Sequence, residues 1–311
     1  MILFSPDKWP ARLFSCLCLT MLFTVPPAVS QERELFKPRL SIKLTKGWGP
    51  DLRIGDMNTH LESINNMETF AYLREYYPDL ISGEIKTLDG DIPDWHLEFR
   101  LDVSRRFSLA LGTSMPFQKS NESVIDWAQT LDQRDIYTIR TKIQSLPPVI
   151  WSAYYGLFPD SRLNVLLNVG AGLYLMKMSE YYNIEIILLP QEPLWWRRSL
   201  ETRACGAIGI HAGIELGFDV TKSITLVAEA QWRYARIRRF YGYQLDETVF
   251  GMHEEYRGNI YYYTRDDNFT GNRYEDLGVF CGAIYFPFGE RPSGMDLSRY
   301  SFRIGIRIKL F

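Results

Sequence analysis

The feature that most constrains the fold is a strict alternation of apolar and polar side chains, which recurs in eight separate runs. In one of them Leu97, Phe99 and Leu101 alternate with Glu98 and Arg100. Successive side chains of a β-strand point to opposite faces, so each run predicts a strand with one apolar and one polar face. The runs cover residues 39–44, 95–103, 107–112, 149–157, 163–174, 208–218, 224–234 and 302–310.

The connections between these runs alternate between short and long. Tight turns join three pairs of runs, at 104–106, 159–161 and 219–222. The other four connections are far longer and cover 45–94, 113–148, 175–207 and 235–301. This order is typical of outer-membrane barrels, which have short periplasmic turns and long external loops. We therefore predict an all-β fold, an eight-stranded antiparallel up-and-down transmembrane β-barrel with long external loops.

Composition narrows the class further. Beyond residue 30 no apolar stretch reaches the roughly 20 residues of a membrane-spanning helix. A hydrophobic content of 46% excludes a disordered chain, and 35 basic against 37 acidic residues give no excess of positive charge for nucleic acid. A transmembrane barrel remains compatible with this composition because its strands carry only a weak hydropathy signal.

The N-terminal segment has the pattern of an export signal. Two basic residues precede a short apolar run, and the small residues Ala28 and Ser30 follow it. A basic start, an apolar centre and small residues before the cut are typical of a secretory signal peptide. We predict a cleaved signal at 1–30, a barrel domain at 31–311 and a location in the cell outer membrane.

A soluble barrel that binds a ligand in its interior, as lipocalins do, shares this alternation and is a competing interpretation. Three observations favour an apolar face that meets lipid. The polar faces carry charged residues together with glycines, which suits a narrow and packed interior. The connections are very unequal in length, and the chain ends on an aromatic residue at the close of a strand.

With these features in view, residues 38–311 resemble bacterial outer-membrane β-barrel proteins of the small eight-stranded OmpA/OmpX/OmpW type. The signal, the alternation and the segments 170–174, 211–213 and 295–298 carry the resemblance. It implies contact with outer-membrane lipid and lipopolysaccharide, and insertion by the barrel assembly machinery, which reads the last strand. Phe311 departs from the usual pattern, because it is in phase with Lys309 rather than with the apolar positions. The implied assembly signal comprises Phe302, Ile304, Ile306, Ile308, Leu310 and Phe311.

The polar faces predict what fills the barrel. Eight strands leave an interior that side chains just fill, and charges in it must pair because an unpaired buried charge costs several kcal/mol. We expect a structural network of ion pairs in a closed lumen, with a structural or surface-binding role for the protein. A narrow channel or transporter for a small or hydrophobic solute is the alternative. The inward polar positions are Arg39, Lys43, Glu98, Arg100, Asp102, His211, Glu215, Glu229, Arg233, Arg303 and Arg307.

Little in the sequence indicates catalysis, a metal or a cofactor. His211 shares a face with Glu215, but it has no nucleophile at a matching position and is interpreted as a hydrogen-bonded interior residue. No Gly-rich loop follows a strand into a helix, as a phosphate site requires. We expect no cofactor and no enzyme activity. An enzyme that acts on lipid is a distant third possibility, since some eight-stranded barrels modify lipid A with a histidine at the rim.

The long loops are where function varies in such proteins. Apolar residues at helical spacing over 57–76 predict a short helix over or beside the barrel mouth. Cys205 and Cys281, both in external segments, can form a disulfide in an oxidising compartment. Residues 276–288 are rich in Gly, Phe and Tyr and predict an extra hairpin.

Aromatic residues gather in three of the long segments, at 195–196, 241–243 and 261–263. They belong either to a girdle at the membrane interface or to strands that continue above it. A surface that binds a glycan or a protein is the functional alternative. The sequence does not identify the external ligand.

Overall fold

The computed structural model describes residues 36–49, 55–88, 94–128, 130, 132–266, 273–280 and 291–310, with the backbone alone at 265–266, 273–274 and 280. The predicted signal peptide, Phe311 and Cys281 lie outside these residues. Most of the hairpin predicted at 276–288 also lies outside them, and residues 276–280 belong to a longer strand. Within the described part of the chain, neither helix is long and apolar enough to cross a membrane.

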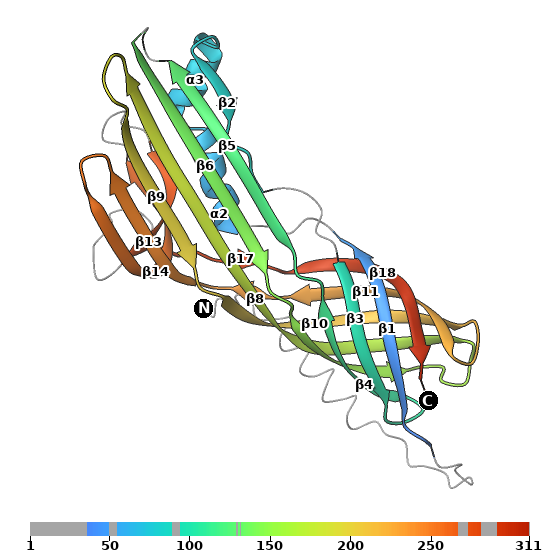
Figure 1. Ribbon diagram of the computed structural model, residues 1–311. Helices are drawn as coiled ribbons and strands as arrows, with labels where there is room; N and C mark the ends of the chain where they lie inside the picture. The colour runs from blue at the N-terminus through green and yellow to red at the C-terminus, as the bar shows by residue number, and fades with distance from the viewer. Residues whose placement is uncertain are drawn as a thin grey trace, which may run out of the picture. The chain divides into compact units, whose positions relative to one another are not determined.

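Eight antiparallel strands form a closed barrel (Figure 1). The ring closes because β8 pairs with β10 as well as with β7. Around the barrel the strands are β1 (Arg39–Trp48), β3 (Asp94–Asp102), β4 (Phe107–Ser114), β7 (Val149–Gly156), the first part of β8 (Leu163–Leu188), β10 (Cys205–Asp219), β11 (Ile224–Tyr234) and β18 (Arg299–Lys309). These are the eight strands that the alternation predicts, so the predicted barrel is confirmed.

The barrel wall is apolar outside and polar inside. Phe99 and Ile214 are each 49% exposed, whereas the adjacent Glu98 and Glu215 are 1% and 0% exposed. A barrel that stores an apolar ligand would need the opposite arrangement. The structure therefore contradicts the competing interpretation of a barrel with its apolar face inward.

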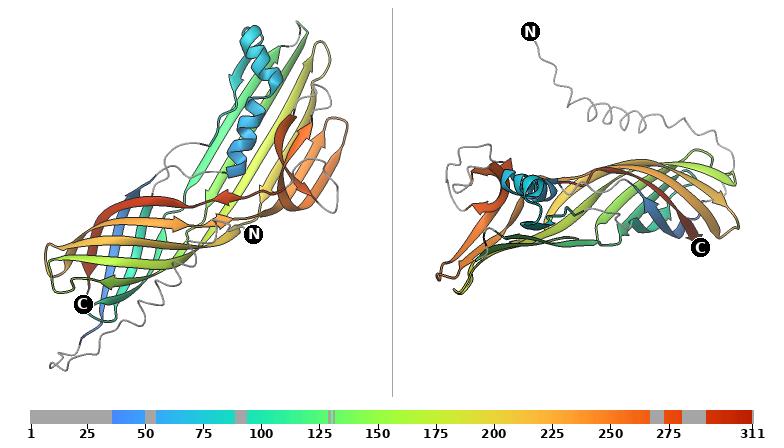
Figure 2. Two further views of the ribbon diagram at one scale, coloured as in Figure 1. Left: turned by 180° about the vertical axis from the view of Figure 1, so that it is seen from behind. Right: turned by 90° about the horizontal axis from the view of Figure 1, so that it is seen from above.

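Strand β8 continues beyond the barrel into a second sheet, which we call the distal sheet (Figures 1 and 2). Its residues 176–188 pair with β6, and residues 179–186 pair with β9. The four long connections thus contribute strands to the distal sheet, and the first of them also contains two helices. In order, the distal sheet contains β2 (Ile81–Glu84), β5 (Gln118–Ala128), β6 (Gln133–Ser145), β8, β9 (Leu194–Thr202), β13 (Phe240–Thr248), β14 (His253–Asp266) and β15 (Arg273–Phe280). Three short strands complete the fold, namely β16 (Arg291–Pro292), which pairs with β14, and β12 (Arg236–Ile237), which pairs with β17 (Met295–Asp296).

Two helices cover one face of the distal sheet, α2 (Gly55–Asn65) and α3 (Glu68–Tyr76) (Figure 2). The single helix predicted over 57–76 is therefore wrong in one respect, because Met67 adopts an extended ψ of 136° that interrupts the helical path. The predicted apolar face is present. Leu61 and Phe70 pack with Ile125 and Ile139 in one hydrophobic core between the helices and the sheet.

The aromatic residues of the long segments belong to the distal sheet. Trp195 and Trp196 lie on β9, Tyr241 and Tyr243 on β13, and Tyr261, Tyr262 and Tyr263 on β14. Tyr262 is part of the hydrophobic core under the helices. These residues therefore follow the second of the two predicted alternatives, strands that continue past the barrel.

Candidate functional site

A buried lysine in the barrel interior is surrounded by three carboxylates. Lys43 Nζ lies 3.0 Å from Glu215, 3.2 Å from Glu229 and 3.3 Å from Glu98. It also donates a hydrogen bond of 2.9 Å to the Tyr154 hydroxyl. None of these five side chains belongs to a residue more than 4% exposed. The charge of the lysine is therefore compensated by neighbouring side chains rather than by water.

Arg100 holds two of the same carboxylates from another strand. Its guanidinium donates to both oxygens of Glu215, at 2.9 and 2.6 Å, and its Nε donates to Glu98 at 3.1 Å. The guanidinium carbon lies 3.6 Å from the centre of the Tyr154 ring. Bidentate pairing and stacking both require a planar guanidinium, so a lysine would not replace Arg100.

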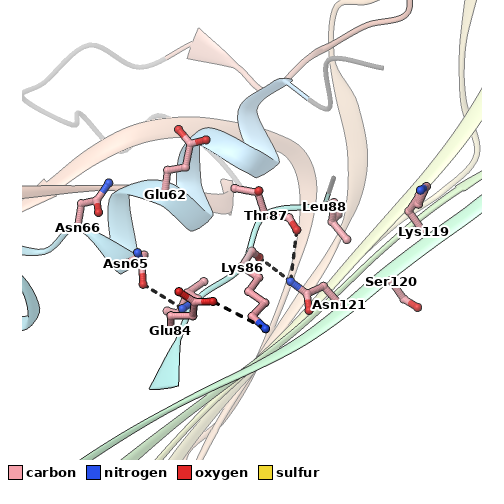
Figure 3. A pocket seen from close by; sticks show the side chains of 11 residues that line it. Glu62, Asn65, Asn66, Glu84, Lys86, Thr87, Leu88, Lys119, Ser120 and Asn121 are labelled. Carbon is pink, nitrogen blue, oxygen red and sulfur yellow. Dashed lines mark hydrogen bonds and ion pairs between the residues drawn. The ribbon is translucent and has the colours of Figure 1, made fainter. Parts of the chain in front are cut away.

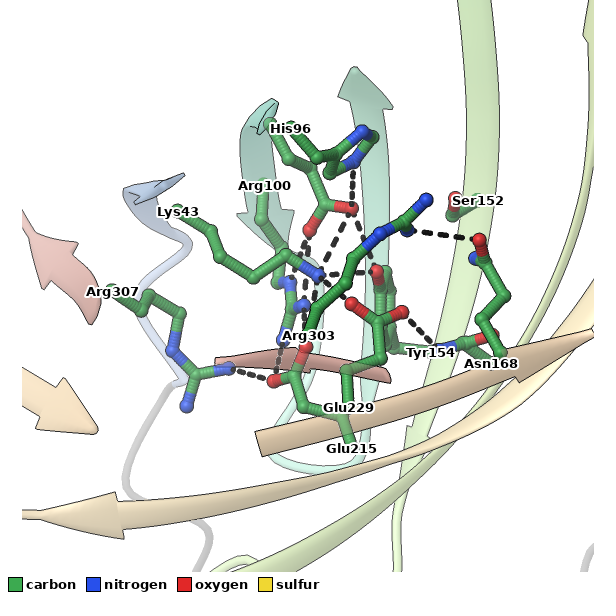
Figure 4. A network of polar contacts seen from close by, with 12 residues as sticks. Lys43, His96, Arg100, Ser152, Tyr154, Asn168, Glu215, Glu229, Arg303 and Arg307 are labelled. Atoms are coloured by element: carbon green, nitrogen blue, oxygen red, sulfur yellow. Dashed lines mark hydrogen bonds and ion pairs between the residues drawn. The ribbon is translucent and has the colours of Figure 1, made fainter. Parts of the chain in front are cut away.

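Two further side chains, Arg307 and Asn168, complete the network (Figure 4). Arg307 donates a hydrogen bond to Glu215 at 3.0 Å, and Asn168 donates one to Glu229 at 2.9 Å. The Tyr154 hydroxyl donates to Glu98 at 2.7 Å. Two arginines and one lysine thus face three glutamates, and the network carries no net charge. A low-dielectric interior holds ions only when they are compensated in this way.

A second polar group lies nearer to the distal sheet, around Asp94 at the start of β3. Arg303 Nε donates to Asp94 at 3.1 Å, and Arg299 lies 3.1 Å from the same carboxylate. Arg303 also donates to Gln231 at 2.9 Å. The interior therefore carries paired charges at two levels.

Ser152 and His211 form an interior pair that the sequence does not reveal. Ser152 Oγ lies 3.0 Å from His211 Nε2, and both residues are buried. Glu215, which the sequence places on the same face as His211, is instead bound by Arg100. Among the described residues His211 Nδ1 has no hydrogen-bond partner, so the third member of a hydrolytic triad is missing from them.

Three of the predicted lumen residues belong to none of these interior groups. Arg39 is exposed at the end of the barrel that carries the tight turns. Asp102 is half-buried and accepts a hydrogen bond of 2.7 Å from Ser108. Arg233 is half-buried, with its guanidinium carbon 4.8 Å from the centre of the Tyr174 ring. All three stand near the ends of their strands.

The interior groups also contain residues that were absent from the predicted set. Tyr154 and Asn168 link the carboxylates, and Ser152 contacts His211. All three stand at inward positions of alternating runs. Their place in the alternation showed that these three side chains face inward. A search of the inward positions for charged residues alone does not find them.

A buried charged cluster connects helix α2 to the distal sheet. Arg198 on β9 donates to both oxygens of Asp276 on β15, at 2.8 and 2.7 Å, and contacts Glu180 on β8 at 3.1 Å. His60 on α2 places Nε2 3.1 Å from Glu180 and Nδ1 2.7 Å from the carbonyl oxygen of Glu275. Both ring nitrogens face acceptors, an arrangement that favours the doubly protonated imidazole, and in that form the cluster is neutral.

The pKa values in this cluster follow from its geometry. Burial alone lowers the pKa of the His60 imidazole, but the adjacent Glu180 carboxylate outweighs burial and raises this pKa above its ordinary value. Burial alone raises the pKa of Asp276, but the Arg198 guanidinium holds it well below its usual range. Helix α2 is thus attached to the sheet by ionised groups as well as by the hydrophobic core.

A polar cleft of about 620 Å³ lies between α2, the segment 84–88 and β5 (Figure 3). Its walls are fixed by hydrogen bonds, since Asn121 donates to the carbonyl oxygen of Lys86 at 2.6 Å and Ile85 N donates to Asn65 at 2.9 Å. Side chains of both charges line it, among them Glu84 and Lys86. The cleft therefore offers both donors and acceptors to a polar ligand.

The predicted assembly strand and disulfide have different outcomes. Phe302, Ile304, Ile306, Ile308 and Leu310 all face outward, with exposures from 40% to 64%. Their role in assembly stays a prediction. The disulfide also stays a prediction, because only one of the two cysteines is described; Cys205 Sγ accepts a hydrogen bond of 3.3 Å from Tyr241 N.

No protein-family model and no curated protein matches the chain. Among solved structures it is similar to a major outer membrane protein from Thermus thermophilus, at 8% identity and a TM-score of 0.36, over 88% of this chain and 100% of that one. It is also similar to OprG from Pseudomonas aeruginosa, at 8% identity and a TM-score of 0.34, over 88% and 95% of the two chains. It is similar as well to the outer membrane protease OmpT from Escherichia coli, at 8% identity and a TM-score of 0.32, over 91% of this chain and 99% of that one. Likenesses of this size carry no conclusion about function. The pairing of its own strands makes this chain a closed eight-stranded barrel of the outer-membrane type.

Proposed function

We propose that the protein is an integral outer-membrane barrel with a closed lumen, which presents the distal sheet as a rigid binding surface outside the cell. The ion-pair network around Lys43 and Glu215 carries this proposal. A solute that passed through the lumen would have to separate several buried ion pairs, and each separation leaves an uncompensated charge. This favours a structural and surface-binding role over transport.

The apolar wall supports the membrane location. The outward positions of β11 are apolar or aromatic from Ile224 to Tyr234, a strand of 11 residues. At about 3.3 Å per residue and a tilt of about 40°, such a strand covers about 25–30 Å of membrane depth. This matches the apolar band of outer-membrane barrels.

The construction of the distal sheet supports a binding role. Loops that only connect barrel strands need no core, yet α2 and α3 bury Leu61 and Phe70 against the sheet. A surface that is already ordered binds a ligand without the entropic cost of ordering flexible segments. The polar cleft beside α2 gives this surface a concave site for a polar ligand.

Two epitope insertions test the location and the orientation. The first epitope is inserted at Gly251, where an added Cβ would meet no atom within 4 Å. The matched control epitope is inserted at Asp160, in the turn between β7 and β8. We expect antibody to label intact cells only through the Gly251 insertion, and membrane-extracted protein to migrate faster on gels before boiling than after. A soluble periplasmic protein without this mobility shift would contradict the proposal.

A further inference from the structure

The outer surface of the barrel changes from apolar to basic where the distal sheet begins. On β11 the exposed positions are apolar or aromatic up to Tyr234, and the next two exposed positions in phase are Arg236 and Arg238. On β8 the exposed Leu173 is followed in phase by the exposed Lys177. Both segments keep the alternation of the strand, so the basic side chains extend the outer surface of the wall and not the lumen.

Six exposed basic residues gather in this region, and we call them the basic belt. Arg203 lies beside the segment that carries Arg238 and Arg239, because its backbone N–H donates to the carbonyl oxygen of Tyr241 at 2.9 Å and its guanidinium carbon lies 5.4 Å from the centre of the Tyr241 ring. Lys142 and Lys177 lie on the paired strands β6 and β8. The belt consists of Lys142, Lys177, Arg203, Arg236, Arg238 and Arg239.

The charges of the belt are not compensated by the described part of the chain. Elsewhere on the distal sheet, exposed arginines are paired, since Arg134, Arg140 and Arg257 each contact a carboxylate. No such ion pair joins a belt residue to a described carboxylate. The two adjacent carboxylates, Glu201 and Asp296, accept hydrogen bonds from a tyrosine hydroxyl and a backbone N–H instead.

We propose that the basic belt binds the phosphate groups of an anionic glycolipid in the outer leaflet, an inference that rests on the membrane insertion proposed above. Trp232 and Tyr234, stacked with ring centres 6.3 Å apart, stand at the end of the apolar band, where aromatic residues mark the membrane interface. Basic residues one step further lie at the depth of lipid headgroups. Arginine is suited to this partner because its guanidinium binds phosphate oxygens bidentately. The acyl chains of the same lipid would cover the apolar wall beside the belt.

The test compares lipid retention by folded, full-length protein in mild detergent, read by native mass spectrometry. The lipids are bisphosphorylated lipid A and the same lipid after removal of both phosphates. The belt variant is R236Q/R238Q/R239Q. The matched control, R105Q/R162Q/K222Q, removes three exposed charges at the turn end of the barrel. We expect the belt variant to bind bisphosphorylated lipid A about a hundredfold more weakly than wild type, roughly fivefold for each charge, and the control to stay within about twofold.

Three results would overturn the inference. These are wild-type affinity in the belt variant, an equal loss in the control variant, and equal binding of the two lipids by the wild type. Insertion of each variant into phosphatidylcholine vesicles, read by gel mobility, separates this inference from the proposed function. Failure of the wild type to insert would contradict the membrane location itself, whereas normal insertion with unchanged lipid binding would contradict only the belt.

Discussion

Arg100 binds both carboxylate oxygens of Glu215 in the barrel interior, at 2.9 and 2.6 Å. The same carboxylate accepts hydrogen bonds from Lys43 and Arg307, each at 3.0 Å. One buried glutamate therefore partly balances the charges of three cationic side chains, which come from three other strands. The charge balance of the barrel interior depends strongly on this one residue.

Glu215→Gln keeps the size of this side chain and removes its charge. We expect the free energy of unfolding to fall by about 3–5 kcal/mol, because an uncompensated cation remains in the interior. Urea titration of the folded gel band, after refolding in detergent micelles, measures the change. Glu201→Gln, at an exposed position, is the control and should change stability by less than about 1 kcal/mol. Equal midpoints for E215Q and wild type would show that the interior is hydrated rather than closed.

Leu61→Ala tests whether the distal sheet depends on its helices. Leu61 is 1% exposed on α2, and loss of such a side chain typically costs about 2–5 kcal/mol. We expect protease to cut the link between α2 and α3 faster, while the barrel keeps its gel mobility. Tyr72→Ala, at a position that is 52% exposed on α3, is the control and should leave the cleavage rate unchanged. Equal cleavage of L61A and wild type would argue against a packed distal surface.

The attachment of α2 should weaken at alkaline pH. The pKa of His60 is raised in the folded state, so its contribution is complete below the ordinary value of about 6.5 and is lost as pH rises through the folded pKa. Glu180 and Asp276 have lowered pKa values, so they remain ionised throughout this range. Hydrogen exchange of α2 amides, corrected for its intrinsic pH dependence, should therefore report protection that weakens as pH rises above about 6.5.

His60→Asn is the control for this pH dependence. Without a group that titrates, its α2 protection should be lower than that of wild type near pH 6 and nearly constant above it. The charged groups that face His60 come from three strands, namely Glu180, Arg198, Glu275 and Asp276. A wild-type profile as flat as that of H60N would contradict the ionised attachment.

The barrel strands could be predicted because each face of a barrel strand has one uniform environment. Phe99 and Glu98 show this directly, one exposed on the wall and the other buried in the interior. Strand β9 of the distal sheet lacks this contrast. Trp195 and Trp196 on β9 are both half-buried, on opposite faces, so no clean alternation marks their strand.

The candidate site could be predicted from the sequence only in part, because alternation gives the direction of a side chain but not its partners. The alternation shows that Lys43 and Glu215 both point into the lumen, but the partners of each depend on how far the strands are staggered around the barrel. The cluster of His60, Glu180 and Asp276 is still harder to predict from the sequence. It joins a helix to strands that are distant in the sequence, and no local pattern links them.

Single-channel recording of purified, folded protein in planar lipid bilayers tests the closed lumen most directly. A closed lumen predicts no steady conductance steps above the bare bilayer. A variant that replaces four charged residues of the network by serine, namely Lys43, Glu98, Arg100 and Glu215, should conduct and so show that the assay detects an open barrel. Reproducible steady conductance in the wild type would contradict the closed lumen.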